Sequence, residues 1–251
     1  MKWKVFFASA AGKHHLVNNM PCQDSGHYLV IEDVLIGVVC DGAGSASEGQ
    51  AGAEFFARRI TELISDSVRC GRFAKVPPSG YRDCLMAIIR EARSQMNEIA
   101  VSRQLSLRDY ACTLVGCITS RDGGCLFHIG DGFAVYSRQT GESVLSHPEN
   151  GEYTDETYFV TDEIWEEHLR VTPICEINRG CLIGLMSDGA SPFAINRMRN
   201  GFYRPFIDPV VTFLSNATEQ NGNQALKNVL ADEKTFDITP DDKALLLALA
   251  S

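Results

Sequence analysis

Aspartates stand at the ends of several apolar runs in this chain of 251 residues. Three of them end a run beside a glycine, as Asp41-Gly42, Asp131-Gly132 and Asp188-Gly189. Asp241 opens the last apolar run, and Asp24 comes shortly before the first pair of runs that read as a hairpin. A single Asp-Gly is ordinarily a turn. Several carboxylates at one sheet edge would bind hard cations through oxygen, which suits Mg²⁺ or Mn²⁺.

The elements that must position these aspartates are mostly strands. Apolar runs predict strands at Trp3–Ser9, Tyr28–Ile31, Val34–Cys40, Cys112–Thr119, Cys125–Ile129, Phe133–Ser137, Cys181–Met186 and Ala244–Ala250. Short turn sequences join the second strand to the third and the fourth to the fifth, and each of these pairs is typical of a hairpin.

Two long helices are predicted between the hairpins. The first has capping-box spacing at Ser45–Glu48, and the second follows Pro77–Gly80 and carries apolar residues on one face. Further helices are predicted at Pro205–Leu214 and Gln224–Leu230. Residues 139–180 are polar and poorly periodic, which favours a functional loop or flap. Hairpins on both sides of paired helices indicate an α+β domain of antiparallel sheets covered by helices.

Composition and charge exclude several classes of function. The chain has 32 Asp+Glu against 23 Lys+Arg, a net charge of −9, which argues against nucleic acid or an anionic membrane as main partner. Nine cysteines without a C-x-x-C pair indicate free thiols in a reducing compartment. The N-terminal run resembles a signal peptide, but the opening strand explains it better, so we expect a cytoplasmic protein.

Five short motifs carry a resemblance to a known family. They are Gln23-Asp24, Val38–Ser45, Ile129–Asp131, Met186–Gly189 and Asp241-Asp242, in that order along the chain. The series resembles the metal-dependent (type 2C, PPM) Ser/Thr protein phosphatases. The segment Gly151–Thr157 and the region of Gly12 and His15 are most similar to the divergent bacterial single-domain branch of that family.

The resemblance implies a fold and a ligand set. The fold would be a four-layer αββα sandwich, two antiparallel β-sheets flanked by helices, with residues 1–251 as a single phosphatase catalytic domain. Asp41 would bridge two cations, and the Gly42 carbonyl would bind one of them. Asp188 and Asp241 would complete the pair of sites, and Asp131 would help to hold a weaker third cation. Asp24 would bind a cation or orient metal-bound water.

The implied chemistry needs no covalent intermediate. A water bridging two divalent cations would have a pKa lowered toward neutrality and would attack phosphorus directly. The resemblance thus implies a phosphoprotein phosphatase that uses two to three Mn²⁺ or Mg²⁺ ions, acts on phosphoserine and phosphothreonine and opposes a Ser/Thr kinase. We expect it to be a monomer.

Two positions depart from the family pattern. Asn19 stands where many members have an arginine that grips the substrate phosphate, and His15 is the candidate phosphate-binding substitute. Ala43 stands where eukaryotic members have a histidine proposed as general acid. These departures leave two alternatives open: a catalytically weak module of the same fold that binds phosphoproteins, and a phosphoesterase acting on a small molecule.

Overall fold

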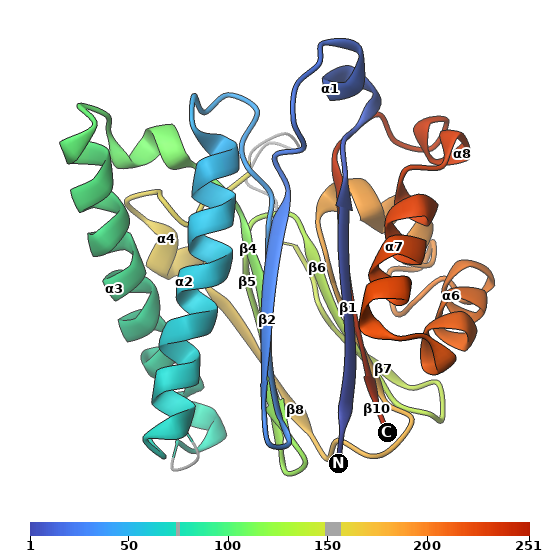
Figure 1. Ribbon diagram of the computed structural model, residues 1–251. Coiled ribbons are helices and arrows are strands. Elements are labelled where there is room, and N and C mark those ends of the chain that lie inside the picture. The colour runs from blue at the N-terminus through green and yellow to red at the C-terminus, as the bar shows by residue number, and fades with distance from the viewer. Residues whose placement is uncertain (74–75, 149–156) are drawn as a thin grey trace.

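The structure is a computed structural model that describes residues 1–73, 76–148 and 157–251. In this part of the chain, ten strands form two antiparallel sheets (Figure 1). Sheet A has the order β1 (Trp3–Ala10), β10 (Lys243–Ala250), β9 (Leu182–Met186), β6 (Phe133–Ser137) and β7 (Ser143–Ser146). Sheet B has the order β2 (Ser25–Ile31), β3 (Val34–Cys40), β4 (Leu114–Ser120), β5 (Gly123–Ile129) and β8 (Arg170–Cys175).

The strands are apolar on both faces because both faces are covered. On β10, Leu246 and Ala248 pack between the two sheets, whereas Leu245 and Leu247 pack against the helices outside sheet A. This alternation follows from the two-residue period of a strand. It also explains why the central strands appear in the sequence as unbroken apolar runs.

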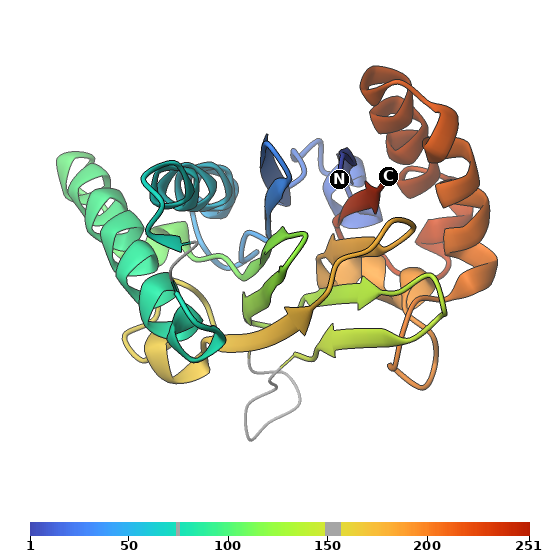
Figure 2. The same ribbon diagram turned by 90° about the horizontal axis from the view of Figure 1, so that it is seen from below.

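Helices form the two outer layers (Figure 2). Sheet B is covered by α2 (Gly49–Arg69) and α3 (Tyr81–Ser102). Sheet A is covered by α5 (Ser191–Ala194), α6 (Arg204–Asn216) and α7 (Glu219–Leu230). Three shorter helices are α1 (Lys13–Val17), α4 (Trp165–His168) and α8 (Glu233–Phe236). The predicted four-layer αββα sandwich is therefore confirmed. Among the described helices, none is both long and apolar enough to cross a membrane.

The predicted capping box at Ser45–Glu48 does not form. The helix begins at Gly49, and no side chain caps its first turn. The preceding loop is instead bound to the segment before β4, because the Glu48 N–H donates to the Asp109 carbonyl at 2.8 Å. The Ser47 hydroxyl donates to Asp109 Oδ1 at 3.0 Å, so this hydroxyl is used across the loop and not within the helix.

The prediction of one long loop over residues 139–180 was wrong in part. This stretch contains β7, α4 and β8. The sequence signal of β8 is weak because the strand lies at the edge of sheet B, pairs only with β5 and contains Pro173. Residues 149–156, with most of the Gly151–Thr157 segment, lie outside the described residues.

Candidate active site

The predicted aspartates lie where strands of both sheets end. Asp41 directly follows β3 of sheet B, and Asp188 follows β9 of sheet A after one residue. Asp24 directly precedes β2, and Asp241 precedes β10. Asp131 lies in the short turn between β5 and β6, which passes from sheet B to sheet A.

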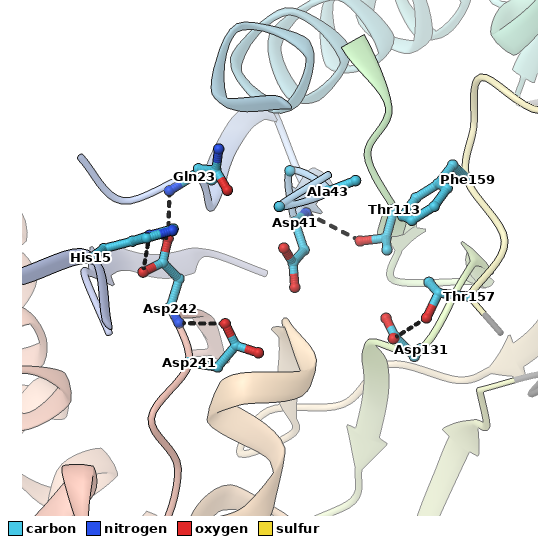
Figure 3. Close-up of a pocket in the computed structure, with 12 residues that line it drawn as sticks. His15, Gln23, Asp41, Ala43, Thr113, Asp131, Thr157, Phe159, Asp241 and Asp242 are labelled. Atoms are coloured by element: carbon cyan, nitrogen blue, oxygen red, sulfur yellow. Dashed lines mark hydrogen bonds and ion pairs between the residues drawn. The ribbon is translucent and has the colours of Figure 1, made fainter. Parts of the chain in front are cut away.

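A cavity of about 270 Å³ opens among these strand ends (Figure 3). Its lining residues are His15, Gln23, Asp41, Gly42, Ala43, Gly44, Thr113, Asp131, Thr157, Phe159, Asp241 and Asp242. Asp24 and Asp188 are not in the lining, but both contact the Asp41 carboxyl group. All five predicted aspartates therefore lie in or beside one cavity.

Gly42 allows the chain to pass close to α2 at the cavity wall. A Cβ atom at this position would lie 2.6 Å from the backbone of Gly49 and 2.9 Å from the Gln23 carbonyl. The Gly42 N–H donates to that same carbonyl at 3.3 Å. A larger residue would push apart the two segments that carry Asp24 and Asp41.

Three carboxyl groups form the deepest part of the site. The side chain of Asp41 lies close to those of Asp24 and Asp188. Burial, opposed in part by hydrogen bonds from Ser187 and Asp41, raises the pKa of Asp24 to about 8. Burial, with the charges of Asp131 and Asp241, raises the pKa of Asp188 to about 6. Burial and the charges of Asp24 and Asp188 likewise raise the pKa of Asp41. Such close carboxylates repel unless a proton or a cation lies between them.

The donor set fits a hard cation. Asp24 Oδ1 and Asp188 Oδ1 are buried and, within the described residues, have no hydrogen-bond partner. Lone pairs without a partner are costly in a protein interior, and a cation would satisfy them. The described residues include no group of three or more His, Cys, Asp or Glu side chains already arranged to hold an ion. The carboxyl groups would therefore turn about their side-chain bonds on binding one. An all-oxygen set is the kind that Mg²⁺ and Mn²⁺ prefer.

Hydroxyl groups orient the carboxylates at the cavity. The Ser187 hydroxyl donates to Asp24 Oδ2 at 2.6 Å and accepts the N–H of Ala244 on β10 at 2.9 Å. On the opposite wall, the Thr157 hydroxyl donates to Asp131 Oδ2 at 2.7 Å (Figure 3). Ser187 thus links Asp24 of one sheet to a strand of the other.

Thr113 fixes the backbone at Asp41. Its N–H donates to the Asp41 carbonyl at 2.8 Å, and its hydroxyl oxygen accepts the Asp41 N–H at 3.1 Å. Both backbone groups of Asp41 are therefore bound to one residue just before β4. This pairing continues the contact between β3 and β4 beyond the end of the sheet.

Asp242 has a different environment from Asp241 beside it. Asp241 is exposed and lines the cavity, whereas Asp242 is only 4% exposed. The carboxylate of Asp242 accepts the Gly12 N–H at 2.7 Å and the Gln23 N–H at 2.6 Å. Its two oxygens also lie 2.8 Å from His15 Nδ1 (Figure 3). One buried carboxylate thus binds the N-terminal segment of the chain to the start of β10.

Of the residues linked to the departures from the family pattern, His15 and Ala43 line the cavity. His15, the predicted phosphate-binding residue, lines the cavity with its Nδ1 turned to Asp242. Ala43 lines the cavity as well. Asn19 is exposed and has a φ of 53°, a left-handed conformation that asparagine tolerates better than most residues.

Sequence reasoning did not single out several residues of the site. Asp242 stood beside a predicted ligand, but its partners are about 220 residues away along the chain, so no local pattern reveals its role. The other missed residues are Gln23, Thr113, Thr157, Phe159 and Ser187. Of these, Gln23 and Ser187 stand within the quoted motifs, each directly before an aspartate, but were given no role.

Comparison with known proteins agrees with this geometry. Residues 11–231 match the family described as Protein phosphatase 2C. The chain therefore belongs to the protein phosphatase 2C family of serine/threonine protein phosphatases, which is metal-dependent, and phosphoproteins are its substrates. Among curated proteins, it is similar to serine/threonine-protein phosphatase 3 of Escherichia coli (strain K12). The two are 31% identical over 258 residues, covering 99% of each chain.

Solved structures show the same fold at low sequence identity. The serine/threonine phosphatase of S. agalactiae has a TM-score of 0.62 at 16% identity, with 100% of both chains covered. Stp1 from Staphylococcus aureus has a TM-score of 0.61 at 15% identity, covering 100% of this chain and 96% of the other. RsbX, whose crystal structure is a complex with magnesium, has a TM-score of 0.56 at 13% identity, covering 99% of this chain and 96% of the other.

Proposed function

We propose that this phosphatase hydrolyses phosphoserine and phosphothreonine by direct attack of water, with two to three Mn²⁺ or Mg²⁺ ions held by the strand-end aspartates. The observation that carries the proposal is the contact of the Asp41 carboxyl group with those of Asp24 and Asp188 at the base of the cavity. These three groups come from both sheets, and their mutual repulsion is relieved by divalent cations.

Each ligand has a proposed role. Asp41, at the centre of the carboxyl cluster, would bridge two cations, with the Gly42 carbonyl on one of them. Asp188 and Asp241 would complete this pair of sites, and Asp131 would join Asp188 in holding a weaker third cation. In support, the charges of Asp131 and Asp241 both act on Asp188.

When bound, such cations lower the pKa of a shared water and thus supply a nucleophile at neutral pH. The chain's own residues do the positioning. Asp24, fixed by the Ser187 hydroxyl, would orient the attacking water, because its second oxygen is buried without a partner among the described residues. The cavity lining described above contains no Cys or Ser side chain, in keeping with direct attack by water.

His15 would bind the phosphoryl group in place of the absent arginine. Its Nδ1 is occupied by Asp242, so the ring is held in one orientation at the cavity wall. With Nδ1 directed at Asp242, the other ring nitrogen is the atom that would contact the phosphoryl group. Ala43 supplies no proton donor, so protonation of the leaving group would come from a water molecule or another residue.

We also propose that residues 1–251 act as one catalytic domain, because the proposed ligands run from position 24 to position 241. The protein would act as a monomer that opposes a Ser/Thr kinase. We propose the cytoplasm as its compartment, because all nine cysteines lie in the described residues as free thiols.

The test is hydrolysis of a phosphoserine peptide and of p-nitrophenyl phosphate after removal of metal by EDTA and re-addition of Mn²⁺ or Mg²⁺. We expect turnover only with the cation, and loss of turnover in Asp41→Ala.

A matched control is Asp208→Ala. Asp208 is an exposed aspartate on α6, and its partner is Arg204, one turn earlier on the same helix. Metal-independent turnover, or full activity of Asp41→Ala, would contradict the proposal. Binding of the peptide without turnover would favour a regulatory module, and turnover of small esters alone would favour a small-molecule phosphoesterase.

A further inference from the structure

The segment between β1 and β2 exposes apolar side chains beside the cavity. It contains α1, which has no buried residue and projects beyond the sheets in Figure 1. Leu16 is 53% exposed, Val17 73% and Met20 41%. Three large apolar side chains thus contact solvent within five residues of one another in the sequence. We call these three residues the α1 apolar shelf.

The shelf is held firmly at its base. Asp242 accepts hydrogen bonds from the backbone at both ends of the excursion, at Gly12 and at Gln23, and contacts His15 within it. Gly12 also packs closely on the loop before β10, because a Cβ there would lie 2.3 Å from the Asp241 backbone. The segment that carries these apolar side chains is therefore anchored, so their exposure does not result from a loosely held loop.

A groove that continues the catalytic cavity lies along α1, the helix that carries Leu16 and Val17. This groove of about 220 Å³ is lined by His14, His15, Pro240, Asp241 and Asp242. His15, Asp241 and Asp242 also line the catalytic cavity. A polypeptide with its phosphorylated residue in the cavity has a path along the groove between α1 and the loop that precedes β10. On α1, which forms one side of this path, Val17 lies three residues after His14 and so shares a helix face with this lining residue, and Leu16 precedes Val17.

We propose that the α1 apolar shelf binds the substrate polypeptide next to the phosphorylated residue and selects phosphoproteins with a large apolar side chain there. The proposal rests on the proposed function, since it needs the phosphoryl group in the aspartate-lined cavity. A phosphoprotein is the occupant that continuity with the cavity favours, because the chain of the substrate must leave the cavity on some side. An apolar side chain gains the most from contact with Leu16, Val17 and Met20, since such contact removes apolar surface from water.

The experiment compares substrates that reach the shelf with one that does not. Phosphoserine peptides carry either leucine or serine at the positions before and after the phosphoserine, and p-nitrophenyl phosphate occupies only the cavity. We expect the wild-type protein to prefer one leucine peptide over its serine counterpart by about fivefold in kcat/KM, mainly through KM. In the variant with Leu16→Ser, Val17→Ser and Met20→Ser, this preference should disappear while turnover of p-nitrophenyl phosphate stays within about twofold.

The control variant is Phe213→Ser, which changes an apolar residue 55% exposed on α6, outside sheet A. It should keep the peptide preference. Thermal unfolding of both variants checks the fold, which exposed positions should leave intact.

Three outcomes would overturn the inference: no preference among peptides in the wild type, an equal loss on peptides and p-nitrophenyl phosphate, or self-association of the wild type that the shelf variant abolishes. Absence of metal-stimulated turnover on every substrate would contradict the proposed function as well. In that case binding of the leucine and serine peptides, measured by fluorescence anisotropy, still tests the shelf on its own.

Discussion

At the scale of single residues, Asp241 and Asp242 show how neighbouring aspartates take different tasks. They precede the same strand, and the chain turns so that Asp241 faces the cavity while Asp242 is buried against the N-terminal segment. The Asp242 N–H donates to Asp241 Oδ1 at 2.9 Å, which ties the two orientations together. The Asp241 carboxylate faces the cavity, where we propose that it binds a cation, and the Asp242 carboxylate satisfies backbone donors that would otherwise be buried alone.

This difference predicts opposite effects of two alanine substitutions. Asp242→Ala leaves the Gly12 and Gln23 N–H groups and His15 without their acceptor, so the free energy of unfolding should fall by about 2 to 4 kcal/mol. Asp241→Ala removes an exposed charge near other carboxylates and should leave the stability of the metal-free protein unchanged or higher. It should nevertheless lower metal-dependent turnover by at least about tenfold, because even residues that only support a ligand have effects of that size.

Urea unfolding in EDTA and turnover in Mn²⁺, measured on both variants, check this pair of expectations. The two assays serve as controls for each other. Equal losses of stability in Asp241→Ala and Asp242→Ala would show that the division of tasks is wrong.

At the scale of elements, arginines of α3 fix the segment that forms one wall of the cavity. Arg93 donates to the Val160 carbonyl and lies over the Trp165 ring at 5.4 Å. Arg82 donates to the carbonyls of Glu166 and Leu169. The segment from residue 157 to residue 169 therefore follows α3, and it carries Thr157 and Phe159 into the cavity wall.

Loss of the Arg93 side chain should loosen this wall. Arg93→Ala leaves the Val160 carbonyl without its donor and removes contact with Trp165. We therefore expect the free energy of unfolding to fall by about 1 to 3 kcal/mol and the KM to rise. Hydrogen exchange of residues 157–169 should become faster. The matched control is Arg90→Ala on the same helix, whose ion pair with Glu166 is exposed and should contribute little to stability. Unchanged exchange in Arg93→Ala would show that α3 does not fix the wall.

The same scale shows which elements the sequence reveals. The strands covered on both faces, such as β3 and β10, were predicted nearly to the residue because burial makes them continuous apolar runs. β8 was missed because an edge strand with exposed residues has little such signal. The start of α2 was misplaced because Ser47 and Glu48 bind the segment before β4, and a local capping pattern carries no information about that distant partner.

For the candidate site, the sequence reveals residues whose position at a strand end is itself the signal, and the five aspartates predicted in this way lie in or beside one cavity. It does not reveal residues such as Asp242 and Thr157, whose partners are brought near only by the fold. The shape of the groove beside α1 likewise depends on contact between the two ends of the chain.

At the scale of the whole molecule, the acidic site opposes folding when no cation is bound. The pKa of Asp24 is raised to about 8 and that of Asp188 to about 6, chiefly by burial. The folded chain then retains protons that the unfolded chain releases near pH 4. The contribution of these groups to stability is therefore fully present below about pH 4 and is lost as the pH rises through about 6 and about 8.

Cations should reverse this dependence. A divalent ion binds the carboxylate form of these groups and stabilises the folded state by an amount that grows with the logarithm of its concentration relative to Kd, about 2.7 kcal/mol at a hundred times Kd. Because protons compete with the ion, the rise in Tm caused by Mg²⁺ should be larger at about pH 8.5 than at about pH 6. In EDTA, Tm should be lower at the higher pH.

The variant Asp24→Asn tests the origin of this dependence. It removes the carboxyl group with the higher of the two pKa values, so the Tm measured in EDTA should depend less on pH. Asp208→Asn, on the surface of α6, should leave this pH dependence unchanged. A Tm that does not respond to Mg²⁺ at either pH would contradict a cation site among these aspartates, because a ligand that binds only the folded state must stabilise it.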